Sequence, residues 1–239
     1  MKKLAFFVEG QAEQMFAQGL VEFCAKECNL SIESKRGNLG KKGQRIYMEI
    51  DAKKIGTGED YFVLIVDSAG DESVVSDIIE RFEGLGRESY SMILGLRDVR
   101  PNFSREEIDR LQMGMNSAVA PLIGIPIELY LSIMEIESWF LAENTHFVRI
   151  DADLTKERIT EEVGFFPDNQ NAESRDIPSK DLDDIYKIVG KQYDKSRSVV
   201  TEVINTLSFV DIVEIHSLEI ENLGGVVNGL NGFFRHNEV

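Results

Sequence analysis

Apolar and polar positions along the chain follow two different periods, which predict strands and helices in turn. Strand patterns, either continuous apolar runs or strict alternation, cover residues 3–8, 45–50, 61–67, 89–98 and 125–133. Helical patterns, with apolar residues three and four positions apart, cover residues 11–28, 71–86, a segment starting at Ser104, and 134–144. Strands that alternate with helices predict right-handed βαβ units, and therefore an α/β fold with a Rossmann-like, mostly parallel sheet flanked by helices.

The alternation of strands and helices weakens after about residue 145. Residues 165–180 have the composition of an exposed loop, and helical patterns return over residues 180–193 and 196–207. The chain of 239 residues is 43% apolar, which is enough for one large domain with an appendage. We therefore expect an α/β domain over residues 1–145 and a mainly helical C-terminal extension over residues 146–239, packed on it.

Acidic residues stand where four of the predicted strands end. They are Glu9, Asp67, Asp98, and the pair Glu135 and Glu137. In an open parallel sheet the carboxyl ends of the strands share one edge, where ligands bind. Carboxylates brought together there repel each other, and a hard divalent cation such as Mg²⁺ or Mn²⁺ relieves that repulsion.

Further acids extend this predicted cation site. Glu13 lies one helical turn after Glu9 and can point at the same edge of the sheet, and Asp71 follows Asp67 after a short loop. The predicted metal ligands are Glu9, Glu13, Asp67, Asp71 and Glu137, with Asp98 and Glu135 as additional candidates.

Some of these acids also have purely structural interpretations. Glu13 can be an exposed helix residue, and Asp71 can cap the helix that follows it. Asp98 can pair with an arginine of its own loop, Arg97 or Arg100. Glu135 and Glu137 lie two positions apart, so on a helix they face different directions and only one is expected to reach the site.

The formal net charge of −16 argues against a protein that coats duplex DNA through a broad basic face. It still allows an enzyme that meets a nucleic acid through bound divalent cations. One segment, residues 34–45, is basic and contains no acid, and we expect it to be a hairpin or loop. Its cations are candidate phosphate contacts, with an ordinary solvated turn as the alternative: Lys35, Arg36, Lys41, Lys42 and Arg45.

The expected location is the cytoplasm. No apolar run approaches the roughly 20 residues that a membrane span needs, so no membrane partner is expected. The apolar run at residues 4–8 ends at Glu9, too early for a signal sequence. Cys24 and Cys28 are read as free thiols in a reducing compartment.

The segment "FVEGQAEQMF", residues 7–16, resembles the opening motif of Toprim domains. It is similar in particular to nucleases of the overcoming-lysogenization-defect type and to uncharacterised Toprim-like proteins of bacterial defence operons. Three later segments fit the same pattern: "VLIVDSAGD", "IMEIESWFLAE" and "SKDLDDIYKIVGKQYDK". The resemblance touches most of the chain, and its first motif is the most specific part.

The resemblance implies roles for individual residues. Glu9 matches the catalytic glutamate, Glu13 its helical companion, and Asp67 the first acid of an Asp-x-Asp element. Ala69 stands where the second aspartate of that element belongs, so the next acid is Asp71. Glu135 or Glu137 matches the later acidic element, and Lys195 is the implied phosphate-contacting cation. The implied catalytic set is Glu9, Asp67 and Lys195.

These observations lead to a Mg²⁺- or Mn²⁺-dependent nuclease, a hydrolase of DNA or RNA, as the expected function. The resemblance further implies anti-phage defence or toxin-like biology and an ATPase partner subunit. Apart from the resemblance, the oligomeric state stays open, with a homo-oligomer as one option. The alternative is a catalytically impaired Toprim-like subunit that binds or regulates a larger complex, and the alanine at position 69 favours it. A small-molecule phosphotransferase or phosphatase on a similar sheet ranks last, because the sequence "VDSAGD" lacks the Asp-x-Asp such enzymes commonly use.

Overall fold

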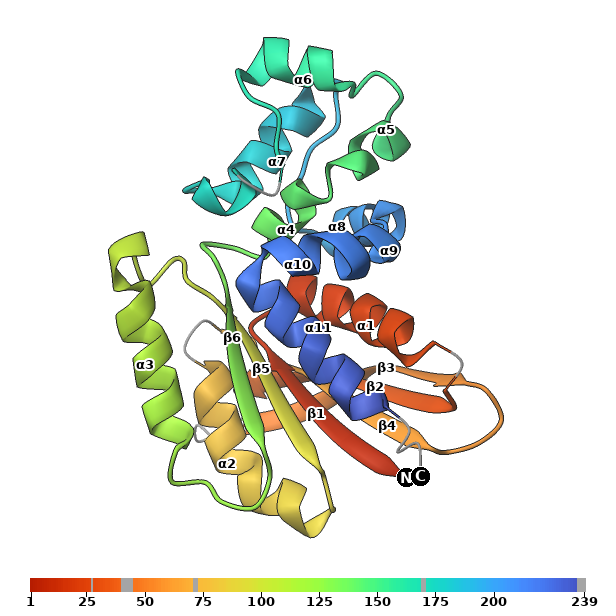
Figure 1. Ribbon diagram of the computed structural model, residues 1–239, viewed down its shortest axis with the longest axis vertical. Helices are drawn as coiled ribbons and strands as arrows, with labels where there is room; N and C mark the ends of the chain where they lie inside the picture. The colour runs from red at the N-terminus through yellow and green to blue at the C-terminus, as the bar shows by residue number, and fades with distance from the viewer. Residues whose placement is uncertain (27, 40–44, 71–72, 169–170, 236–239) are drawn as a thin grey trace.

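A twisted sheet forms the centre of the protein in the computed structural model, which describes residues 1–239 except 27, 40–44, 71–72, 169–170 and 236–239 (Figure 1). Within the described residues the sheet has six strands in the order β3-β2-β4-β1-β5-β6. The strands are β1 (Lys2–Val8), β2 (Leu30–Leu39), β3 (Arg45–Ile55), β4 (Tyr61–Asp67), β5 (Met92–Asp98) and β6 (Ile127–Ser132). Strand β3 is antiparallel to β2, and the other pairs are parallel. The predicted α/β class with a mostly parallel sheet is therefore confirmed.

The apolar run of β1 is continuous because both faces of this central strand are covered. Leu4, Phe6 and Val8 belong to the hydrophobic core on one face of the sheet. Ala5 and Phe7 belong to the core on the other face. The side chains of strand β4 are divided between the same two cores. Strands β1 and β4 pair with each other, so these two apolar strands are neighbours at the centre of the sheet.

Helices cover both faces of the sheet and rise beyond the carboxyl ends of its strands (Figure 1). One face is covered by α1 (Gln11–Ala25) and α11 (Glu221–Phe234), the other by α2 (Ser73–Arg87) and α3 (Ile108–Val119). The remaining helices are α4 (Glu137–Ala142), α5 (Phe147–Ile150), α6 (Lys156–Val163), α7 (Pro178–Lys187), α8 (Arg197–Thr206), α9 (Phe209–Asp211) and α10 (Ser217–Glu219). There are also 3₁₀ turns, η2 (Arg105–Glu107), η3 (Asn144–His146) and η4 (Ala172–Ser174), and a π-helical turn, η5 (Ile212–His216). In the described part of the chain, no helix is both long enough and apolar enough to cross a membrane.

Strands β2 and β3 form the hairpin that is one of the two expectations for residues 34–45: they pair antiparallel, from Leu30 opposite Ile55 to Leu39 opposite Arg45. Residues 34–39 continue β2, which pairs in parallel with β4 from Leu30 opposite Tyr61 to Arg36 opposite Asp67. Partners on both sides supply the backbone hydrogen bonds of this strand, so its polar side chains do not prevent it from forming. The pairing brings Arg36 directly beside Asp67, at the edge where the parallel strands end.

An aromatic cluster packs the helices beyond the sheet onto α1. The ring of Phe16 lies with its centroid 5.8 Å from that of Trp139, 5.6 Å from that of Phe140 and 5.7 Å from that of Phe209. All but the half-buried Phe209 are buried, and rings at such separations add to the stability that burial provides. Because Phe16 follows Glu13 by three residues, this contact also fixes the turn of α1 that carries Glu13 against α4.

Helix α11 was not predicted from the sequence, because its four glycines obscure the helical pattern. One of them, Gly224, is buried, and a Cβ at this position would lie 2.3 Å from the backbone oxygen of Ser217. Gly232 in the same helix is exposed, and a Cβ there would meet nothing within 4 Å. The glycine at position 224 is thus a packing requirement, whereas that at position 232 is not.

Gly224→Ala should lower the free energy of unfolding by about 1–3 kcal/mol, because a backbone oxygen must move to admit the methyl group. Gly232→Ala, the matched control, should raise it by up to about 1 kcal/mol through the helix propensity of alanine. Urea unfolding followed by the fluorescence of the single tryptophan, Trp139, measures both. Equal effects of the two substitutions would contradict this packing of α11.

Candidate active site

A cavity of about 340 Å³ opens where the parallel strands end, at the edge of the sheet that faces the upper helices. Its charged lining residues are Glu9, Glu13, Arg36, Asp67, Asp98 and Lys195. They come from the turn after β1, from α1, β2, β4 and β5, and from the segment between α7 and α8. The structure therefore brings together acids that lie up to about ninety positions apart in the sequence, as expected from the parallel sheet.

Glu9 reaches the cavity from the turn between β1 and α1, and Glu13 reaches it from the first turn of α1. The side-chain oxygen Oε2 of Glu9 accepts a hydrogen bond of 3.1 Å from the backbone N–H of Asp98. Gly10 lies between the two acids, and a Cβ there would come within 3.0 Å of Glu13 Oε2. The glycine of the "VEG" motif thus leaves room for Glu13 to lie against the backbone. Glu13 is only 6% exposed, so the alternative of an exposed helix residue is not what the structure shows.

Asp67 is the most buried acid of the cavity lining, at 1% exposure. Its Oδ1 accepts a hydrogen bond of 2.8 Å from the backbone N–H of Ala69, and its Oδ2 lies 3.3 Å from Arg36 Nε. Within the described residues Oδ2 has no hydrogen bond of normal geometry, so its contact with Arg36 is an attraction of charges. Ala69 itself adopts a left-handed conformation, with φ of 51°.

Asp98 enters the cavity from the end of β5 and is held by β6. The hydroxyl of Ser132 donates to Asp98 Oδ1. The alternative that Asp98 pairs with Arg97 or Arg100 is not realised among the described residues. Arg97 instead lies over the ring of Phe103, and Arg100 donates to the backbone oxygen of Asp176.

Glu137 lies at the start of α4 and is fully buried. Its two oxygens accept hydrogen bonds from the hydroxyl of Tyr193, at 2.7 Å, and from Nζ of Lys195, at 3.0 Å. Tyr193 and Lys195 belong to the segment between α7 and α8. The segment between α7 and α8 therefore contributes Lys195 to the cavity lining, and Glu137 accepts a hydrogen bond from it without lining the cavity itself.

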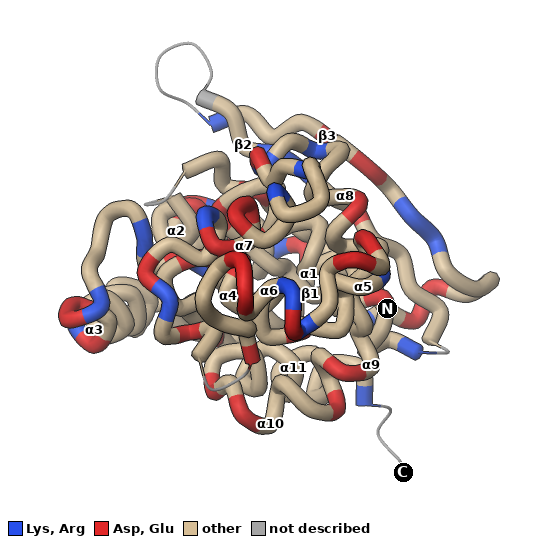
Figure 2. Tube along the Cα trace, turned by 90° about the horizontal axis from the view of Figure 1, so that it is seen from above, with Lys and Arg blue, Asp and Glu red and all other residues tan. Residues whose placement is uncertain are grey.

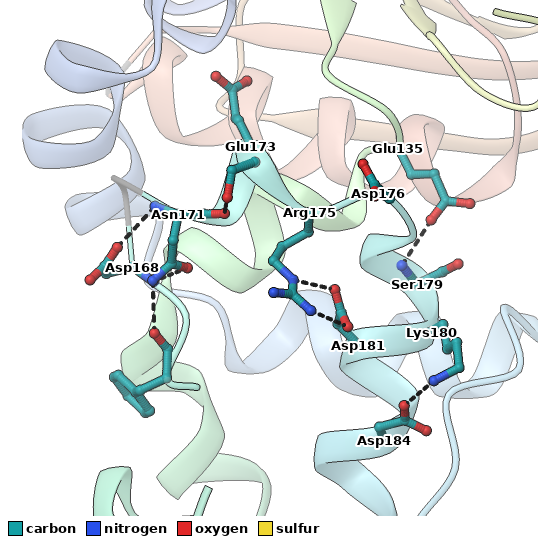
Figure 3. A network of polar contacts seen from close by, with 12 residues as sticks. Glu135, Asp168, Asn171, Glu173, Arg175, Asp176, Ser179, Lys180, Asp181 and Asp184 are labelled. Atoms are coloured by element: carbon teal, nitrogen blue, oxygen red, sulfur yellow. Dashed lines mark hydrogen bonds and ion pairs between the residues drawn. The ribbon is translucent and has the colours of Figure 1, made fainter. Parts of the chain in front are cut away.

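Glu135 points toward Ser179 in the first turn of α7 (Figure 3). Its Oε2 accepts a hydrogen bond of 2.8 Å from the backbone N–H of Ser179, and its Oε1 lies 3.8 Å from Lys195 Nζ. A carboxylate is well placed at a helix N-terminus, where backbone N–H groups lack partners within the helix. Neither Glu135 nor Glu137 is among the residues that line the cavity, and Glu137 is connected to it through its hydrogen bond with Lys195.

Burial and mutual repulsion together disfavour the charged forms of these acids. Burial and then the charge of Glu137 raise the pKa of Glu13 from 4.5 to about 7, although Lys195 opposes the shift. Burial, followed by the charges of Glu13 and Glu9, raises the pKa of Asp98 well above its ordinary value. Burial alone would lower the pKa of Lys195, but the surrounding carboxylates outweigh it and the pKa is raised. The cluster thus holds more negative charge than its two cations balance.

The basic residues of β2 and β3 are the other predicted site residues (Figure 2). Lys35 pairs with Glu33 at 2.9 Å, and Arg36 lines the cavity. Arg45 donates to Asp77 at 2.9 Å and to the backbone oxygen of Ser68 at 2.6 Å, so its guanidinium holds the loop after Asp67. The predicted contacts Lys41 and Lys42, and the predicted ligand Asp71, lie outside the described residues.

Sequence reasoning missed Tyr193 and Ser132, which hold Glu137 and Asp98, because single hydroxyl residues carry no recognisable spacing. It also missed a backbone feature of the site. Ala69, Met134 and Lys195 have positive φ angles of 51°, 66° and 57°. Left-handed conformations of residues other than glycine carry strain and cluster at functional sites. No sequence pattern marks these positions, since none of the three residue types favours that conformation.

The cavity fits a hard divalent cation in the chemistry of its donors: carboxylate oxygens, buried, with excess negative charge. Within the described ranges, however, no three His, Cys, Asp or Glu side chains are arranged around one point as metal ligands. Comparison of the chain with protein-family models, curated proteins and solved structures finds no match.

Proposed function

We propose that this protein is a Mg²⁺- or Mn²⁺-dependent hydrolase of phosphodiester bonds in DNA or RNA. One observation carries the proposal: carboxylates from the ends of β1, β4 and β5 and from α1 line a single cavity together with an arginine and a lysine. Acids alone would suit many cation-binding roles. The two basic side chains in the same lining, Arg36 and Lys195, add the positive charge that stabilises a bound phosphate.

The residues of the cavity divide into two chemical roles. Glu9, Glu13 and Asp98 would hold a divalent cation, which when bound supplies an activated water and stabilises charge on the phosphate. Lys195, whose Nζ lies 3.0 Å from Glu137 Oε2, would orient a phosphate oxygen by its charge. Glu137 and Tyr193 would keep that ammonium group in place.

The similarity of the "VEGQAE" segment to Toprim nucleases supports the same proposal, and with it a role in anti-phage defence or a toxin-like system. An ATPase partner subunit belongs to that biology. The surface of the chain is acidic overall, with a net charge of −16, so a bound divalent cation would be needed to bring a nucleic acid to the cavity.

The direct test is cleavage of labelled DNA and RNA, single- and double-stranded, by the purified protein in the presence of Mg²⁺ or Mn²⁺. The proposal expects cleavage of at least one of these substrates, and expects chelation of the metal to stop it. The absence of cleavage under all these conditions, with Mn²⁺ bound to the protein, would contradict a hydrolase that acts alone.

A second candidate function is a catalytically impaired subunit that binds or regulates a partner. Two observations favour it: Ala69 replaces the second acid of the Asp-x-Asp element, and no three described acids form a ready cation site. Calorimetric titration with Mn²⁺ separates the two functions. Saturable binding supports the hydrolase, whereas the impaired subunit predicts no binding.

A further inference from the structure

Strands β2 and β3 extend together past the end of their neighbour β4. The parallel pairing of β2 with β4 ends at Arg36, which lies opposite Asp67, the last residue of β4. The antiparallel pairing of β2 with β3 continues beyond that point. We call this two-stranded extension, residues 36–39 of β2 and 45–48 of β3, the arm. The arm starts at the cavity, because Arg36 is also one of the residues that line it.

One face of the arm is anchored to the body of the protein. The side chain of Arg45 is only 17% exposed, and it donates to Asp77 at 2.9 Å and to the backbone oxygen of Ser68 at 2.6 Å. Tyr47 lies on the same face of β3, with the guanidinium carbon of Arg81 4.4 Å from the centroid of its ring. Arg45 and Tyr47 therefore hold the arm against α2 and the loop after β4, which leaves the opposite face free.

The opposite face of the arm is exposed and combines apolar with polar side chains. Side chains alternate between the two faces along a strand, and residues directly opposite each other on paired strands share a face. Arg36 lies opposite Met48, and Asn38 lies opposite Ile46. Ile46 is 53% exposed, Met48 is 60% exposed, and the two polar residues are exposed as well. Neighbouring exposed apolar side chains on one face are typical of an interaction surface.

The chemistry of this face matches a nucleic-acid strand whose bases are not paired. The guanidinium of Arg36 suits a phosphate, and the amide of Asn38 offers a donor and an acceptor to the edge of a base. Ile46 and Met48 suit the faces of bases, which a duplex hides in its stack and a single strand exposes. Charge agrees with this occupant: the chain has a net charge of −16, yet no acid lies among residues 34–45.

We propose that the exposed face of the arm is a platform for single-stranded nucleic acid, which it leads to the cavity. Met48 and Ile46 contact the faces of successive bases, Asn38 contacts the edge of a base, and Arg36 contacts a phosphate at the entrance of the cavity. This inference rests on the proposed function and names its substrate class as single-stranded. The fixed orientation of the arm, held through Arg45 and Tyr47, keeps the platform in line with the site.

The experiment measures the binding of a fluorescein-labelled oligothymidylate by anisotropy, with Ca²⁺ in place of Mn²⁺. The oligothymidylate is used alone and annealed to an oligoadenylate of the same length. The wild type should bind the single strand at least about tenfold more tightly than the duplex. A double variant, Ile46→Thr with Met48→Thr, should lose about tenfold in affinity for the single strand, because it removes apolar surface while threonine still suits a strand.

Met113→Thr with Ile123→Thr is the matched control. These residues are of the same two types and are 70% and 88% exposed, but they lie on α3 and in the segment after it, outside the arm and the cavity lining. Their replacement should leave oligothymidylate affinity within about twofold of the wild type. Met48→Phe should raise this affinity at least about threefold, because bases stack on aromatic rings, and such a gain cannot come from misfolding.

The outcomes separate this inference from the proposed function. Equal oligothymidylate affinity of the two double variants, equal affinity of the wild type for single strand and duplex, or no binding by the wild type would overturn the platform. A wild-type dimer that the arm variant dissociates in sedimentation would assign this face to a second copy of the chain and overturn it too. Cleavage of the same oligonucleotides in Mn²⁺ tests the hydrolase separately: binding through the arm without cleavage would support the platform and contradict the hydrolase.

Discussion

Replacing Glu9 by glutamine is expected to reduce nucleic-acid cleavage by at least about a hundredfold, because it removes a charged ligand from the cation site. The substitution is conservative in shape. The glutamine oxygen can still accept the hydrogen bond that Glu9 Oε2 now receives from the backbone of Asp98, at 3.1 Å. Cleavage rates of the wild type and Glu9→Gln in Mn²⁺, measured on the same substrate, test this expectation.

The folded structure should survive this change, and its stability should stay equal or rise, because one of several repelling carboxylates becomes neutral. Glu157→Gln is a suitable control: Glu157 is exposed on α6 and is not among the residues that line the cavity. It should leave both cleavage and stability close to those of the wild type. Full activity of Glu9→Gln would show that the charge of this carboxylate is not needed for cleavage.

Neutralising Glu13 should stabilise the metal-free protein, and more so as the pH rises. The raised pKa, about 7 instead of 4.5, means that between these values the folded protein holds a proton that the unfolded chain has lost. Glu13 therefore subtracts stability as the pH rises through this window, by about 3 kcal/mol when the shift is complete. Burial, Glu137 and Asp67 raise the pKa of Glu13, and the positive charge of Lys195 opposes them.

The comparison must be made between variants, because other groups titrate in the same range. Burial lowers the pKa of His146 to about 4, so the folded state binds fewer protons than the unfolded chain and stability rises with pH over part of the window. The difference between the wild type and Glu13→Gln cancels this contribution. Urea unfolding in a chelating buffer should give a larger advantage for Glu13→Gln at about pH 8 than at about pH 5. An advantage independent of pH, or none, would show that Glu13 titrates normally.

The central sheet could be predicted from the sequence because its strands are long apolar runs with turn residues at their ends. The run at residues 61–67 coincides with β4, Tyr61–Asp67. The start of β2, residues 30–33, was missed because its buried alternation is short, with Leu30 and Ile32 followed by polar and basic residues. What makes it a strand is pairing with β3 and β4, which no local pattern reports.

The site could be predicted as far as it depends on topology. Acids at the ends of parallel strands must share an edge, which places Glu9, Asp67 and Asp98 without any knowledge of packing. The contacts that decide their roles are tertiary. The ion pair of Arg36 with Asp67 and the hydrogen bond from Tyr193 to Glu137 cannot be predicted from the spacing of these residues in the sequence. Each contact joins two segments that only the complete fold brings together.

Calorimetric titration of the wild type, Glu9→Gln and Glu157→Gln with Mn²⁺ tests most directly whether the acid-lined cavity is a cation site. We expect saturable binding to the wild type and to Glu157→Gln, and affinity at least about tenfold weaker in Glu9→Gln. Equal affinities in all three proteins would show that the ion binds outside the cavity. No binding to any of them would contradict a cation site in this protein.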